Sequence, residues 1–331
     1  MVRNGAPMAG QTGLKPMPAP PSLPSGTVGR AIFSMICAVA LFATMNAMVK
    51  YLGGRYPLGQ MIFCRALFAL IVLAPLIKRA GGVVSLGTRR PWGHAARSLI
   101  GVVAMFCGFT AITSLPLANA AAFAFTAPLW TTTLGVLVLG EKVRWRRTLA
   151  LIVGFCGVLI MLRPDVKLLE DILNGGTVAV GSALALTSAA LGACAMISVR
   201  RLSATEPSTT IVFYFMATGC LLSGLLTWPD FVMPDVKDGL LLILIGIIGG
   251  VAQLLLTTAY RGAPVAVIAP FDYTAMLWAT GYGFLLWGEV PDLTLVLGAI
   301  IVVASGAYIT IRETRLGIAS TVSVKQSTKM G

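Results

Sequence analysis

The sequence predicts an all-α integral membrane protein with ten transmembrane helices, arranged as two inverted five-helix repeats. Three observations support this fold class: the composition, a series of long apolar runs, and an internal repeat. Hydrophobic residue types make up 57% of the 331 residues and charged types 11%, and the mean hydropathy is +0.87. A soluble domain carries roughly 25% charged residues. The composition therefore excludes a soluble enzyme, a nucleic-acid-binding module and a wholly disordered chain.

Ten apolar runs are candidates for membrane-spanning helices, which need about 20 mostly apolar residues. The runs are continuous, whereas the strands of a membrane barrel alternate between apolar and polar residues. Helices are therefore expected at ten places: Ala31–Val49, Leu58–Ile77, Ser98–Leu115, Ala118–Leu139, Thr148–Leu162, Thr177–Val199, Thr209–Trp228, Leu240–Tyr260, Ala263–Trp287 and Leu293–Ile311.

The two ends of the chain differ from these runs. Residues 1–27 contain six prolines and almost no apolar run, which is typical of a disordered tail. The segment is too rich in proline to be the basic start of a signal peptide, so the first apolar run is expected to stay in the mature protein. Residues 313–331 form a second short polar tail.

The basic residues indicate the orientation of the chain. The chain carries 25 Lys and Arg against 12 Asp and Glu, which gives a formal net charge of +13. If the ten runs span a membrane, 19 of these 25 basic residues fall on the side of the N-terminal tail. Basic residues are enriched in cytoplasmic loops, so both tails are expected in the cytoplasm and the chain in a bacterial cytoplasmic (inner) membrane. The expected partner is thus the lipid bilayer, and nucleic acid is not expected.

The residue types that hold metals or catalyse reactions do not cluster in the sequence. The six cysteines all fall inside apolar runs, where buried thiols are expected. The single histidine, His94, falls in a predicted cytoplasmic loop. No metal, no cofactor and no enzymatic activity is therefore expected.

The chain repeats itself at an offset of 148 residues. Residues 110–141 align with residues 258–289 without a gap, and 15 of these 32 positions are identical. The identities include Trp130 with Trp278 and Glu141 with Glu289, which shared apolar composition alone would not readily pair. The repeat divides the chain into halves at 28–163 and 178–312, each with five helices. Because five is odd, the second half must insert upside down, as in secondary transporters whose substrate lies between the halves.

These features resemble the EamA-type transporters of the drug/metabolite transporter superfamily. The resemblance rests on two five-helix halves, each with a helix that ends in Gly-Glu, at Gly140-Glu141 and Gly288-Glu289. It implies a central cavity formed mainly by the first, third, fourth, sixth, eighth and ninth helices. Residues 269–313 are most similar to members that take up S-adenosylmethionine or riboflavin, which implies import of a small organic metabolite. Export of amino acids, drugs or other metabolites is the alternative, and a homodimer is left open.

Two charged residues fall inside the apolar runs, where a charge is costly. Asp272 is at the tenth position of its run, and its repeat mate is the apolar Ala124. It is predicted either to bind a cation or carry a proton during transport, or to be a carboxylate bonded to a neighbouring helix. Arg65 is predicted either to bind an anionic substrate group or pair with Asp272, or to extend toward the outer interface.

Uncharged side chains complete the candidate binding site. Trp130 and Trp278 either stack on a planar substrate from opposite halves or pack between helices. Tyr273 is adjacent to Asp272, and Asn46 and Gln253 are polar residues inside apolar runs that could donate hydrogen bonds.

Two prolines and two glutamates have expected structural roles. Pro128 and Pro270 each remove a helix hydrogen bond and are hinge candidates. Glu141 and Glu289 follow the ends of their helices, where a carboxylate needs a basic or backbone N–H partner. Lys50 ends the first apolar run and is expected to anchor the chain at the membrane interface.

Overall fold

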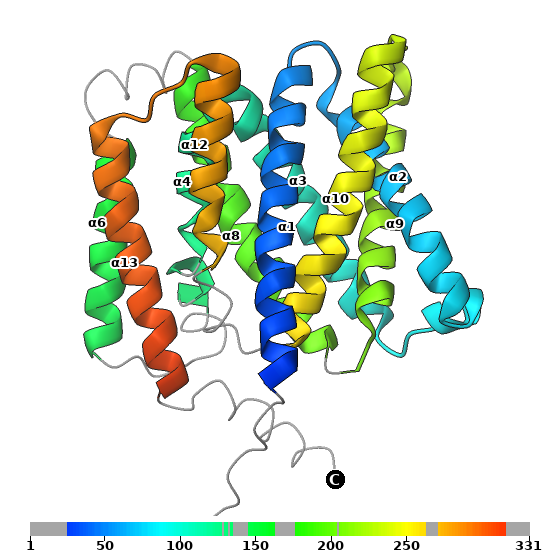
Figure 1. Cartoon of the computed structure of the whole chain (residues 1–331), viewed down its shortest axis with the longest axis horizontal. Helices are drawn as coiled ribbons and strands as arrows, with labels where there is room; N and C mark the ends of the chain where they lie inside the picture. Colours follow the sequence, from blue (N-terminus) through cyan, green and yellow to red (C-terminus); the bar gives the residue numbers. More distant parts are fainter. Residues whose placement is uncertain are drawn as a thin grey trace, which may run out of the picture.

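The computed structural model describes residues 25–127, 129–131, 133–134, 145–162, 176–203, 205–262 and 271–315, and these form a helical bundle (Figure 1). Each of the ten predicted runs contains a described helix, which confirms the predicted fold class. The helices are α1 (Ser25–Leu52), α2 (Leu58–Arg79), α3 (Pro91–Ser114), α4 (Leu117–Ala124), α6 (Trp145–Leu162), α8 (Thr177–Ser203), α9 (Ser208–Thr227), α10 (Val236–Gly262), α12 (Thr274–Trp287) and α13 (Leu293–Arg315). Short 3-10 helices, η1 (Gly82–Leu86) and η2 (Trp228–Asp230), follow α2 and α9.

Six of the described helices are long and apolar enough to cross a membrane: α1, α2, α3, α8, α9 and α10. The apolar parts of α6 and α13 are shorter. The fourth and ninth predicted runs are described only in part, as α4 and α12. The hinge candidates Pro128 and Pro270, together with Glu141, lie outside the described residues.

Helices of the first half pack mainly against helices of the second half. The largest helix contacts are α3 with α8, α1 with α10, α6 with α13 and α2 with α9. In the repeat, α1 corresponds to α8 and α3 to α10, so the α1–α10 contact and the α3–α8 contact are the same contact made twice. In Figure 1 the α6–α13 pair lies at the left side of the bundle and the α2–α9 pair at the right side. The packing thus has the two-fold symmetry of an inverted repeat.

Glycines allow the halves to approach closely at α2 and α10. A Cβ atom at Gly246 of α10 would lie 2.4 Å from the Cβ of Phe68 and 2.8 Å from the carbonyl oxygen of Cys64. A Cβ atom at Gly250, one turn later, would lie 2.9 Å from the Cα of Ala69. Small residues four apart permit this backbone-to-backbone packing between membrane helices.

The starts of two helices differ from the sequence prediction. The first helix begins at Ser25, before the predicted start at Ala31 and inside the predicted tail of residues 1–27. The third helix begins at Pro91, seven residues before the predicted start at Ser98, and proline is favoured at the first position of a helix. His94 and Arg97, which were expected in a loop, therefore lie in α3 and are buried. Their burial against α9 depends on a residue contact that is distant in sequence, which hydropathy along the chain does not report.

Candidate functional site

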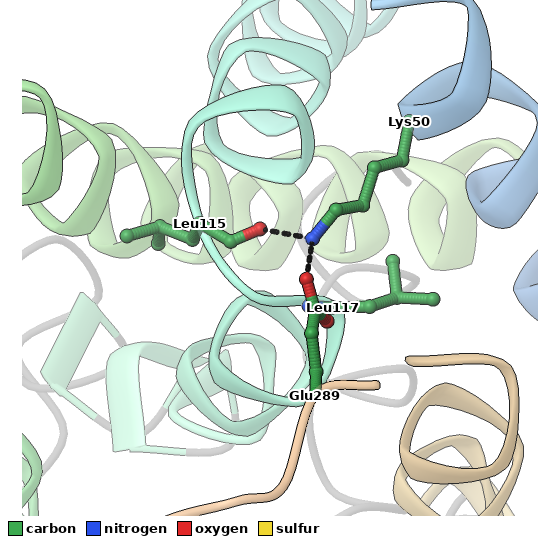
Figure 2. Close-up of polar contacts among 4 residues, drawn as sticks. All are labelled: Lys50, Leu115, Leu117 and Glu289. Carbon is green, nitrogen blue, oxygen red and sulfur yellow. Dashed lines mark hydrogen bonds and ion pairs between the residues drawn. The ribbon is translucent and has the colours of Figure 1, made fainter. Parts of the chain in front are cut away.

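A polar junction joins the two halves at the end of the bundle where α1 ends (Figure 2). The ammonium group of Lys50, in the last turn of α1, pairs with Glu289 Oε1 and donates a 2.9 Å hydrogen bond to the carbonyl oxygen of Leu115. The other oxygen of Glu289 accepts a 2.8 Å hydrogen bond from the backbone N–H of Leu117. One carboxylate from the second half thus holds both α1 and the α3–α4 turn of the first half.

The backbone at the end of α12 places this carboxylate. Gly288 has the left-handed conformation, with φ of 66°, which glycine adopts without strain. The N–H of Gly288 donates to the carbonyl of Phe284 at 3.0 Å, as in an αL cap, and the N–H of Glu289 donates to the carbonyl of Gly283 at 3.0 Å. The chain therefore turns sharply, and the Glu289 side chain points to the first turn of α4, where the N–H groups of a helix attract negative charge.

The structure confirms the partners expected for Glu289 and corrects the role expected for Lys50. Glu289 has both a basic partner and a backbone N–H partner. Lys50 was expected to anchor the chain at the membrane interface, but it bridges the two repeats instead. Its ammonium group also lies 5.1 Å from the centre of the Trp287 ring. The side chains of Lys50 and Glu289 are only 11% and 19% exposed, so water screens the pair weakly.

A second ion pair joins the halves at the same end. Arg55, between α1 and α2, lies 3.5 Å from Asp238 of α10, and the Tyr56 hydroxyl donates to the same carboxylate at 3.1 Å. Desolvation and the neighbouring Asp238 charge raise the pKa of Tyr56 above its usual value of 10, so this hydroxyl stays protonated and donates. In both ion pairs that the described residues form, the cation comes from the first half and the acid from the second.

Asp272 lies toward the opposite end of the bundle, beside the last turn of α10. Its carboxylate accepts a 3.1 Å hydrogen bond from the hydroxyl of Tyr260, two residues before α10 ends. The side chain is partly exposed. The next residue, Tyr273, packs edge-to-face on Phe125, with ring centres 5.2 Å apart. Asp272 is thus hydrogen-bonded to a neighbouring helix, α10.

Arg65 neither pairs with Asp272 nor extends to the interface. It is 4% exposed and lies between α1, α3 and α10. Its guanidinium donates to the sulfur of Met45 at 3.3 Å and to the sulfur of Met105, and it lies 6.0 Å from the centre of the Phe109 ring. Among the described residues, no carboxylate forms an ion pair with it. The charge is buried with only weak sulfur and aromatic partners.

The two repeat-related tryptophans are not brought together. Trp130 packs edge-to-face on Phe155 of α6, with ring centres 5.5 Å apart, and its indole N–H donates to Thr126 at 3.1 Å. Trp278 is 42% exposed on α12. Asn46 is half-buried on α1, and Gln253 is buried on α10.

Sequence reasoning missed Tyr260 as a partner of Asp272. A signal for this pair was nevertheless present. The repeat mate of Tyr260 is Ile112, just as the mate of Asp272 is Ala124. Both members of the hydrogen-bonded pair are therefore polar only in the second half, which marks them as a departure from the symmetry. Over the described ranges, no group of three or more His, Cys, Asp or Glu side chains is placed to hold a metal ion.

Comparison with known families agrees with this geometry. The EamA-like transporter family matches the chain twice, over residues 29–163 and 179–311. The chain belongs to this family. It is therefore a multi-pass membrane protein of a transporter family rather than of an enzyme family.

Curated relatives cover most of the chain. It is 29% identical to the pseudopaline exporter of Pseudomonas aeruginosa over 283 residues, which is 85% of this chain and 95% of that one. It is 30% identical to the riboflavin transporter of Vibrio cholerae over 285 residues, 85% of this chain and 93% of that one. It is 27% identical to the S-adenosylmethionine uptake transporter of Rickettsia prowazekii over 274 residues, 81% of this chain and 88% of that one.

A solved structure has the same fold. It superposes with a TM-score of 0.59 at 21% sequence identity, and the match covers 85% of this chain and 97% of that one.

Proposed function

We propose that the chain is a secondary active transporter that moves a small organic metabolite across the bacterial cytoplasmic membrane by alternating access, with both termini in the cytoplasm. The Lys50–Glu289 junction carries this proposal, because it joins the inverted halves by a largely buried ion pair at the end of the bundle where α1 ends. By the distribution of basic residues this is the outer end. The junction would close the path from outside, and it must break when the transporter opens outward.

Asp272 is the proposed coupling residue. A carboxylate inside a membrane protein is costly unless it has a function or a partner. Its partner here is the neutral Tyr260 hydroxyl, which can donate to the ionised carboxylate and accept from the protonated acid. The site can therefore hold either protonation state. Protonation would remove the negative charge and weaken the binding of a cationic substrate group, which would link transport to the proton gradient.

The direction of transport is proposed as import, of a substrate like riboflavin or S-adenosylmethionine. Two of the three relatives described above are named for these compounds, and the S-adenosylmethionine transporter is named for uptake. Export is the alternative, since the pseudopaline relative is named as an exporter. An inverted repeat is compatible with both directions, because the ion gradient and the affinities on the two sides decide the net flux.

Transport in proteoliposomes tests this proposal. The purified protein is reconstituted in one orientation, and the flux of labelled riboflavin and S-adenosylmethionine is measured in both directions, with and without an imposed pH gradient. We expect a gradient-dependent flux that Asp272→Asn abolishes or makes independent of pH. Asp230→Asn is the matched control, because Asp230 is an exposed acid in η2 and should leave the flux unchanged.

Two results would contradict the proposal. If Asp272→Asn moves substrate at the wild-type rate at every pH, the coupling role is wrong. If the wild-type protein moves neither compound nor any member of a wider metabolite panel in either direction, the transport proposal itself is wrong.

A further inference from the structure

A cluster of buried polar side chains without partners lies on the first turns of α3. His94, Arg97 and Ser98 are 1%, 5% and 0% exposed. Both ring nitrogens of His94, the Nε and one Nη of Arg97, and the hydroxyl of Ser98 lack a hydrogen-bond partner among the described residues. Buried polar groups are nearly always hydrogen-bonded. So many unpaired donors on one helix face indicate that something else is bound there when the protein works.

Arg65 lies further along the same side of α3. Arg97, Gly101 and Met105 are spaced four apart, so they follow one another on one face of the helix. Arg97 Nη1 reaches forward along this face toward Met105, because a Cβ at Gly101 would lie 2.5 Å from it. The Arg65 guanidinium donates to Met105, one turn beyond Gly101. The two guanidinium groups therefore approach the same face of α3 at successive turns of the helix.

No acid compensates this pair of positive charges in the described part of the chain. Neither ion pair of the described residues includes Arg65 or Arg97. Arg97 stacks on the ring of Phe215 at 3.9 Å, a contact that satisfies the face of the guanidinium but not its N–H groups. Glu206, which interacts electrostatically with His94, accepts a 2.7 Å hydrogen bond from Thr88. Two like charges inside a membrane protein need a counter-charge.

The elements around the arginines belong to both repeats. Arg65 comes from α2 and Arg97 from α3 of the first half. Phe215 of α9 and Gly249 of α10, from the second half, pack against them, since a Cβ at Gly249 would lie 3.0 Å from Arg65 Nε. A ligand held by both arginines would therefore contact the boundary along which the halves must move.

We propose that Arg65 and Arg97 together bind an anionic group, a carboxylate or a phosphate, and that this group belongs to the transported metabolite; of the two compounds named above, only S-adenosylmethionine carries such a group. His94 and Ser98 supply further hydrogen-bond donors on the side of Arg97. The planar guanidinium fork suits the paired oxygens of a carboxylate or phosphate. The assignment of the anion to the substrate rests on the transport function proposed above, whereas the binding of an anion does not.

Thermal unfolding of the purified full chain tests the anion site. The melting temperature is measured in neutral detergent with succinate or inorganic phosphate, against sodium chloride at equal ionic strength. We expect each anion at tenfold excess over its dissociation constant to raise the melting temperature by about 3 °C. Arg65→Gln and Arg97→Gln should abolish the rise, and Arg65→Lys and Arg97→Lys should restore part of it. Arg90→Gln is the matched control, because Arg90 is an exposed arginine immediately before α3.

The variants also give a prediction that does not depend on choosing the right anion. If the charges are uncompensated without ligand, Arg65→Gln and Arg97→Gln should fold and melt at a higher temperature than the wild type. If the arginines stabilise the fold instead, both variants should melt lower. The lower melting temperature would overturn the proposal.

A lipid headgroup is the other source of the same chemistry. Nanodiscs of phosphatidylcholine with and without phosphatidylglycerol distinguish the two sources. A shift with phosphatidylglycerol but not with succinate or phosphate would overturn the assignment to a metabolite. Riboflavin flux without any anion-dependent shift would contradict the anion site and leave the transport function standing. A shift that depends on both arginines, without transport of any compound, would support the anion site and contradict the transport function.

Discussion

At the scale of single residues, Glu289 of the second half binds two separate segments of the first half. It accepts from the Lys50 ammonium group and from the Leu117 N–H, and both side chains of the ion pair are largely buried. Removing one member of a buried ion pair leaves the other charge without compensation, whereas removing both avoids that penalty. The pair should therefore show strong energetic coupling.

Lys50→Met is expected to destabilise the protein by about 3 kcal/mol, because it leaves the Glu289 carboxylate buried with a single N–H donor. Glu289→Gln should cost less, since the amide oxygen can still accept from Leu117. The double variant should cost less than the sum of the two by about 0.5–3 kcal/mol. Thermal unfolding followed by tryptophan fluorescence measures these differences.

Arg55→Met is the control, because the Arg55 side chain is 53% exposed and exposed ion pairs contribute about 1 kcal/mol or less. Equal losses for Lys50→Met and Arg55→Met would contradict the importance given to the Lys50–Glu289 junction.

The sequence allowed the kinds of partners at the site to be predicted, but not their identities. The dipole of a helix end requires a donor beside Glu289, and this requirement is local. That the donor is Lys50, 239 positions earlier, depends on the packing of α1 against α12. Likewise, the charge of Arg65 inside an apolar run was evident, but its sulfur partners were not. Asp272 was singled out from its position, while Tyr260 lay at the end of a run, where tyrosine is ordinary.

At the scale of elements, α10 packs on α2 with little space between their backbones. A Cβ at Gly246 would meet both a Cβ and a backbone oxygen of α2, at 2.4 and 2.8 Å. These atoms cannot move aside as the tip of a long side chain can. The helices would have to separate.

Gly246→Ala is therefore expected to destabilise the protein by about 1–3 kcal/mol, although alanine has the higher helix propensity. Gly192→Ala in α8 is the matched control, because no atom lies within 4 Å of a Cβ at that position. This variant should be stabilised by up to about 1 kcal/mol. The melting temperatures of the two variants measure the difference, and a fall of the same size in both would show that close packing is not the cause.

For the eight runs that are described in full, hydropathy predicted the helix ends to within a few residues, apart from the starts of α1, at Ser25 rather than Ala31, and of α3, at Pro91 rather than Ser98. The start of α3 was misplaced because His94 and Arg97 lower the hydropathy of its first turns. Both are buried by aromatic residues of α9, with His94 stacked on Tyr214 at 4.5 Å. A buried polar residue has the same sequence signal as one in a loop, so only the packing distinguishes them.

At the scale of the whole molecule, the inverted repeat and the basic residues predict a topology, with both termini in the cytoplasm, that labelling can check. In a cysteine-free background, Met233→Cys lies in the exposed segment after η2 and Val84→Cys in the exposed η1. A membrane-impermeant maleimide applied to intact cells is expected to label Met233→Cys at once and Val84→Cys only after the membrane is permeabilised. The reverse pattern would place the termini outside.

The contact between Lys50 and Trp287 gives the molecule an intrinsic optical signal. The Lys50 ammonium group lies 5.1 Å from the centre of the indole ring. If the junction opens during transport, as proposed above, this charge moves away from the ring. Indole emission responds to nearby charge, so separation of α1 from α12 should change the spectrum of Trp287 without an attached dye. The five other tryptophans would have to be replaced to isolate this signal. Stopped-flow measurement of Trp287 emission would then follow the rate of the proposed opening at this end in real time. A transport assay reports only the net movement of solute.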